Sequence, residues 1–144
     1  MKALLLLLVT LGGAWASFQT VANFTSNFAA YFEIFDDDVY GPDSLMKATL
    51  IYDGLPIELE ENGGMWLGIG FSATSMLNAD IVICQWNDTN GKTSCSDRKA
   101  NSTYLPNGPP PNDVIDNVWT VSGYKADNRL QMTFKRYLNT QDYA

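Results

Sequence analysis

The side chains that most often carry chemistry are sparse in this sequence of 144 residues. Histidine is absent, which removes the Ser-His-Asp and Cys-His nucleophile arrangements and most zinc and copper sites. Glu58, Glu60 and Glu61 lie in a polar connection, where they indicate a solvated surface rather than an acid–base pair. The acidic run 36–38 lacks the spacing of an EF-hand loop. The sequence therefore predicts a protein that is not an enzyme.

Two cysteines, Cys84 and Cys95, flank a segment that contains the turn signal Asn90-Gly91. If this segment folds as a hairpin, the two cysteines come to lie opposite each other. An even number of cysteines in an oxidising compartment favours a disulfide. Two free buried thiols are the alternative.

The first residues have the pattern of a cleaved secretory signal, predicted here over 1–16. Lys2 provides the positive start, an apolar run follows from Ala3 to Leu11, and Ala14 and Ala16 are small residues at the cleavage positions. An uncleaved anchor is the alternative, but the run is shorter than the roughly 20 residues of a spanning helix. We expect a mature domain over 17–144 that is secreted or lies on the extracellular side of a membrane.

The charge and the glycosylation sequons are consistent with that compartment. The formal net charge is −7 and no basic patch occurs, which argues against a nucleic-acid partner. Three Asn-x-Ser/Thr sequons begin at Asn23, Asn87 and Asn101. We expect a glycan on at least one of Asn87 and Asn101, because these two fall in predicted turns or loops.

The elements that position these residues are predicted to be strands, because apolar and polar residues alternate along most of the chain. Predicted strands cover 28–34, 45–52, 65–71, 81–86, 92–97, 118–124 and 129–138. About seven short strands with turns between them are typical of an antiparallel β-sandwich. In the strand at 65–71, Trp66, Gly68 and Gly70 share one face, and glycines in a strand often mark close approach by a ligand or another backbone.

One charged residue lies in an apolar pattern. Arg136 is in phase with the apolar residues of the last predicted strand, which are Leu130, Met132, Phe134 and Leu138. An inward arginine needs a partner, and we hypothesise that Asp80 pairs with it and holds two strands together. A twist of the strand end that carries Arg136 into solvent is the alternative.

Three motifs occur in a fixed order along the chain. They are Trp-x-Gly-x-Gly-Phe-Ser at 66–72, Met-x-x-Ala-Asp at 76–80, and Phe-x-Arg-x-Leu-x-Thr-x-Asp at 134–142. This order resembles the DOMON domain, which accompanies copper monooxygenases, cellobiose dehydrogenase cytochromes and cytochrome b561 cores. The resemblance extends from roughly Phe28 to Asp142.

The resemblance implies an immunoglobulin-like or DOMON-like β-sandwich that binds haem b for electron transfer, or a sugar. In haem-binding members a methionine after the Gly-Phe-Ser segment is an axial ligand, and Met76 has that position here. The second ligand of that family is a later histidine, which this sequence lacks. Two explanations stay open: the copy of the domain lacks its last strands, or this member does not bind haem and Met76 only packs.

The implied partners are a redox domain, such as a cytochrome b561 core or a copper monooxygenase, or a carbohydrate. The leading interpretation is therefore an extracellular ligand-binding module that is accessory to a redox partner. The alternative is a cofactor-free extracellular domain with a structural or protein-interaction role.

Overall fold

We describe the chain in a computed structural model that defines residues 18–35, 44–54, 64–71, 79–99 and 117–138. Within these ranges the chain forms eight strands in two antiparallel sheets. The described residues contain no helix long and apolar enough to cross a membrane. The all-β sandwich predicted from the alternation is confirmed.

The larger sheet has five strands. In spatial order they are β1 (Phe18–Asn23), β2 (Phe28–Phe35), β3 (Leu45–Asp53), β8 (Arg129–Tyr137) and β7 (Val118–Ala126). β1 was not predicted from the sequence. As an edge strand, β1 pairs only with β2, and its polar residues Gln19, Thr20 and Asn23 leave no clear alternation to detect.

The smaller sheet has three strands, in the order β4 (Gly64–Phe71), β5 (Asp80–Asn87) and β6 (Lys92–Lys99). The turn between β5 and β6 includes Gly91, whose φ of 62° is a left-handed conformation that favours glycine. The register places Leu67, Cys84 and Cys95 side by side across the three strands. The predicted cysteine hairpin is therefore correct.

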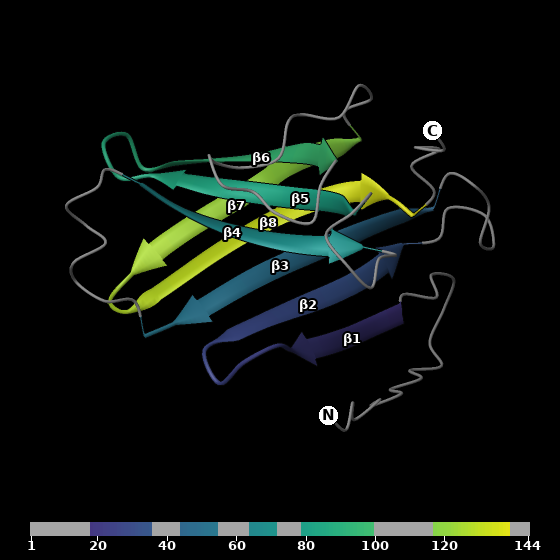
Figure 1. Cartoon of the computed structure of the whole chain (residues 1–144), viewed down its shortest axis with the longest axis horizontal. Coiled ribbons are helices and arrows are strands. Elements are labelled where there is room, and N and C mark those ends of the chain that lie inside the picture. Colours follow the sequence, from purple (N-terminus) through teal and green to yellow (C-terminus); the bar gives the residue numbers. More distant parts are fainter. Residues whose placement is uncertain (1–17, 36–43, 55–63, 72–78, 100–116, 139–144) are drawn as a thin grey trace.

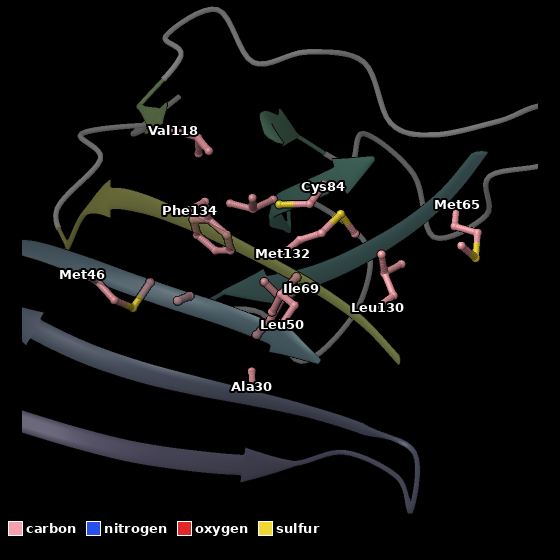
Figure 2. Packing of buried hydrophobic residues seen from close by; sticks show 12 residues of the cluster. Ala30, Met46, Leu50, Met65, Ile69, Cys84, Val118, Leu130, Met132 and Phe134 are labelled. Atoms are coloured by element: carbon pink, nitrogen blue, oxygen red, sulfur yellow. The ribbon is translucent and has the colours of Figure 1, made fainter. Parts of the chain in front are cut away.

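Figure 1 shows the three-stranded sheet lying over the five-stranded sheet. The core lies between them and takes side chains from both layers, as Figure 2 shows for Phe134 and Met132 of β8 near Cys84 of β5. These three residues have no exposed surface. Burial of such apolar area contributes about 25 cal/mol per Å² to the stability of the fold.

The two sheets meet along β6 and β7. The backbone N–H of Cys95 donates a hydrogen bond of 2.7 Å to Oγ1 of Thr120. A Cβ atom at Gly123 would lie 1.5 Å from Oγ1 of Thr93, so only glycine permits this approach. This contact closes one side of the sandwich.

The last strand is slightly shorter than predicted. β8 begins at Arg129 after a turn in which Asp127 has a φ of 53°, and it ends at Tyr137. The prediction that Leu138 shares the inward face is wrong, because Leu138 follows the strand and is 45% exposed. Its backbone N–H instead donates to the carbonyl oxygen of Ser44.

Candidate functional site

The outer face of β4 carries an exposed tryptophan beside two glycines. Trp66 lies on this face with 64% of its surface exposed, whereas Met65 and Ile69 point into the core. The alternation predicted for this strand is thus confirmed. A Cβ at Gly68 would lie 3.5 Å from Cζ3 of Trp66, so the indole leans over a position that has no side chain.

The two glycines of β4 receive side chains from β5. A Cβ at Gly68 would lie 3.6 Å from Cγ1 of Ile83, and one at Gly70 would lie 4.0 Å from Cγ1 of Ile81. Both isoleucines are buried although they belong to the outer face of the sheet. The sequence suggested close approach by a ligand or another backbone at these glycines, whereas isoleucine side chains of β5 lie against both of them and form an apolar strip beside Trp66.

A cavity of about 320 Å³ opens next to the exposed indole. We call it the Trp66 hollow, and its lining residues are Gly64, Met65, Trp66, Gln85, Trp86, Asn87 and Ser94. All three strands of the smaller sheet contribute to this lining. An aromatic wall with amide and hydroxyl groups is the usual composition of a site for a small polar molecule.

Trp86 is held in place by an ionic group at the hairpin turn. Its Nε1–H donates to Oδ1 of Asp88 at 2.7 Å, and Nζ of Lys125 on β7 donates to the same oxygen at 2.8 Å. The hydrogen bond from Lys125 lowers the pKa of Asp88, partial burial opposes this, and the bond from Trp86 adds to the lowering. The hairpin turn is thereby fixed to the larger sheet from the core side, because Trp86, like Cys84 two residues before it, lies on the face opposite Trp66.

Asn87 is the sequon residue at the rim of the hollow. It is exposed, and its Oδ1 accepts hydrogen bonds from the backbone N–H groups of Thr89 and Asn90 at 2.9 and 3.2 Å. These bonds form an Asx turn, a local structure that asparagine favours. The Oδ1 atom of Asn87 is therefore occupied by hydrogen bonds within the turn.

Cys84 and Cys95 form a disulfide between directly paired positions of β5 and β6, with 4.0 Å between their Cα atoms. The predicted bridge is thus confirmed. Because Cys84 is fully buried, the bond lies on the core side of the sheet, opposite the face that carries Trp66. It fixes the register of the two strands that supply Gln85 and Ser94 to the hollow.

Arg136 is 3% exposed and points inward, which excludes the alternative of a solvent-facing arginine. Its Nη1 and Nη2 donate to Oδ1 and Oδ2 of Asp80 at 3.1 and 2.5 Å. The guanidinium carbon lies 4.5 Å from the centre of the Phe71 ring, close enough for a cation–π contact. The hypothesised pair is present, and it joins β8 of one sheet to β5 of the other.

The remaining predicted site residues are not brought together. Met76 and Asn101 lie outside the described residues. Asn23 is exposed at the end of β1, in the larger sheet, and is not among the residues that line the hollow. No group of three or more potential metal-ligating side chains occurs in the part of the chain that the structure describes.

The alternation placed Trp66 on one face with Gly68 and Gly70, but Trp66 was not predicted as a site residue and neither were the residues that complete its hollow. Gln85 and Ser94 have no distinctive motif, and only the strand register places them beside the indole. The Lys125–Asp88 ion pair joins residues that are 37 positions apart and was missed for the same reason. Part of the site could have been predicted from the alternation along β5, because Ile83, Gln85 and Asn87 occupy alternate positions and so share the outer face.

The described residues thus form a two-layer antiparallel sandwich with a small aromatic and polar hollow on the smaller sheet. The sequence model described as "DOMON domain" matches residues 44–144, which is more than half of the chain. The chain therefore belongs to the DOMON family, whose domains are binding modules rather than catalytic domains. Neither the curated proteins nor the solved structures contain a significant match.

Proposed function

We propose that this DOMON domain is an extracellular binding module that holds a carbohydrate in the Trp66 hollow and has no catalytic role of its own. The observation that supports the proposal is the exposed indole of Trp66 beside the side chains of Gln85 and Ser94, which supply an amide and a hydroxyl group. A sugar ring has apolar C–H faces and a polar rim. It can therefore place one face on the indole and direct its hydroxyl groups to the polar side chains.

The size and the rigidity of the hollow suit such a ligand. A volume of about 320 Å³ lies at the lower end of the range for small-molecule sites, which favours one or two sugar rings. The disulfide and the Lys125–Asp88–Trp86 contacts hold β5, β6 and the turn between them in place before any ligand binds. A preformed site loses less conformational entropy on binding, which supports affinity from a small contact area.

The residues present do not fit the haem-binding pattern of the family. The sequence contains no histidine to supply the second axial bond, and a single thioether is a weak anchor. Met46 and Met132 point into the packed core between the sheets. We therefore predict no six-coordinate haem spectrum from residues 17–144. A stable six-coordinate spectrum that is lost in Met76→Ala would contradict this prediction.

The extracellular location is supported by three features of the chain. They are the signal-like segment at 1–16, the sequons, and the disulfide, a bond that persists mainly in oxidising compartments. A redox domain remains a proposed partner. In that arrangement the module would hold the sugar while its partner carries out the chemistry.

Glycan-array screening followed by calorimetry tests the carbohydrate proposal. The secreted protein should be used both with its own glycans and after their enzymatic removal. We expect Trp66→Ala to lower the affinity for the selected glycan about tenfold, or about 1.4 kcal/mol, because it removes the apolar surface on which the sugar face packs. The matched control is Trp119→Ala, because Trp119 is 45% exposed but lies on the larger sheet.

An absence of binding to any glycan in both preparations would contradict the proposal. That result would favour the cofactor-free interaction domain instead. Equal losses of affinity in Trp66→Ala and Trp119→Ala would place the sugar elsewhere than in the hollow.

A further inference from the structure

We infer that Asn87 carries an N-linked glycan whose first sugar lies against Trp66 and restricts access to the Trp66 hollow. The inference rests on the proposed function only in treating the hollow as the ligand site. The position of the glycan itself follows from the geometry of β4, β5 and the turn at 88–91. It assigns to the sequon a regulatory role at this site.

The strand register places Asn87 beside the indole. Asn87 is paired with Gly64, while Trp66 is paired with Gln85, two residues before Asn87 on the same face. Trp66 and Asn87 are thus diagonal neighbours, a relation that separates Cα atoms by roughly 7–8 Å. A sugar ring attached to Asn87 covers this distance, and both residues line the same hollow.

The residue opposite Asn87 is Gly64, which has no side chain to stand between a glycan on Asn87 and the indole of Trp66. Gly64 has no side chain, and a Cβ there would lie 2.8 Å from the carbonyl oxygen of Trp86, so a larger residue would require the backbone to move. The backbone of β5 therefore lies close to Gly64, and no side chain at position 64 separates Asn87 from Trp66. Trp66 follows two residues later on the same face, and its exposed indole is available to a sugar face.

The chemistry of the Asn87 side chain agrees with modification at nitrogen. Its Oδ1 is engaged by the backbone N–H groups of Thr89 and Asn90. In the transfer, Nδ2 loses a proton and forms a bond to C1 of the sugar, while the bond from C1 to a lipid-linked pyrophosphate breaks. The donor is a lipid-pyrophosphate oligosaccharide of the secretory pathway, and the backbone hydrogen bonds to Oδ1 are compatible with the modified amide.

The sequon at Asn23 offers an internal comparison. Asn23 is exposed like Asn87, but it lies at the end of β1 in the other sheet. A glycan at Asn23 has no indole from the smaller sheet beside it. Removal of this second sequon is therefore the matched control.

Tryptophan quenching in the secreted protein tests the inference. Glycosidase treatment and peptide mass analysis first establish whether Asn87 is modified. Thr89→Ala removes the sequon but keeps Asn87 and the backbone donors of its Asx turn. We expect Thr89→Ala to raise the acrylamide quenching constant, whereas Asn23→Gln leaves it unchanged.

Two tryptophan variants show which indole is responsible for the change in acrylamide quenching. The rise caused by Thr89→Ala should disappear in a Trp66→Phe background and persist in a Trp119→Phe background. Trimming the native glycan to its first sugar should preserve the protection, and complete removal should abolish it. This enzymatic series uses the folded wild-type protein, so it still decides the question if Thr89→Ala fails to fold.

An unmodified Asn87 in the secreted protein would overturn the inference. A modified Asn87 with no change in Trp66 quenching after complete deglycosylation would also overturn it. These readouts require no added ligand, so they are independent of glycan-array binding. If the array is negative while the quenching changes as expected, the proposed function fails and the position of the glycan stands.

Discussion

Two Arg–Asp pairs on the same strand have the same chemistry but different surroundings. Arg136 contacts Asp80 through two hydrogen bonds with its side chain 3% exposed, and Arg129 contacts Asp53 through bonds of 2.6 and 3.0 Å with its side chain 52% exposed. Both pairs are bidentate, the geometry that makes arginine–carboxylate contacts specific. The difference between them lies in what each pair connects.

Asp53 and Arg129 are paired positions of neighbouring strands, so the backbone ladder already fixes their register. Asp80 and Arg136 belong to different sheets, which share no backbone ladder in the described residues. The buried pair therefore restricts how one sheet lies on the other, whereas the exposed pair adds to contacts that already exist. What an Arg–Asp pair contributes to the fold therefore depends less on the two residues than on whether backbone hydrogen bonds already join the strands that carry them.

The largest effect is expected from breaking the buried pair. Arg136→Ala should lower the free energy of unfolding by about 3–5 kcal/mol, because it leaves the partly buried carboxylate of Asp80 without its partner and removes the contact with Phe71. Urea denaturation followed by circular dichroism measures this. A change no larger than that of Arg129→Ala would show that burial does not distinguish the two pairs.

Replacing both members of the buried pair sharpens this result. Arg136→Met combined with Asp80→Leu should recover most of the stability lost in Arg136→Ala, because apolar residues of similar volume carry no desolvation cost. If the pair also specifies how the sheets are packed, the double variant should be stable but show poorer dispersion of its methyl signals in NMR spectra. A double variant as unstable as Arg136→Ala would contradict the desolvation argument.

The disulfide is expected to have the next largest effect, although it acts within one sheet. Replacing Cys84 and Cys95 together by alanine should cost roughly 2–3 kcal/mol, because the bridge closes a short loop and mainly limits the unfolded chain. Denaturation of the double variant, with the reduced wild-type protein as a control, measures this cost. A loss that exceeds that of Arg136→Ala would reverse the expected order of the two cross-links.

A smaller effect is expected at the exposed pair. Arg129→Ala should shift the unfolding midpoint only slightly at low ionic strength, and the shift should vanish in about 1 M salt, where the Debye length is only about 3 Å. The effect of Arg136→Ala should persist at the same salt concentration. If salt abolishes both effects equally, solvent reaches the buried pair.

The smallest effect concerns acid pH at the exposed pair. The hydrogen bond from Arg129 lowers the pKa of Asp53 below its ordinary value of 3.8, and partial desolvation opposes this. Because the folded-state pKa is the lower one, the contribution is present above pH 3.8 and is lost as the pH falls through the folded value. The difference in thermal midpoint between wild type and Asp53→Asn should therefore shrink with acidification. A difference that grows in acid would contradict the sign of the pKa shift.

The sequence by itself determined much of the fold, for physical reasons that act locally. Alternation identified strands such as β3 and β8, since a strand with one buried face places apolar residues at every second position. The cysteine hairpin followed from Asn90-Gly91, because the turn and the register it sets depend on neighbouring residues. Arg136 was found because a charge in an apolar phase requires a partner.

The tertiary structure alone decided which residues complete a site. Gln85 and Ser94 join Trp66 only through the register of three strands, and Lys125 reaches Asp88 only because β7 packs beside the hairpin turn. That Arg136 and Asp80 join two sheets rather than two paired strands was likewise decided there. Such contacts depend on the packing of distant segments, and the alternation along one strand carries no information about which strand lies opposite its face.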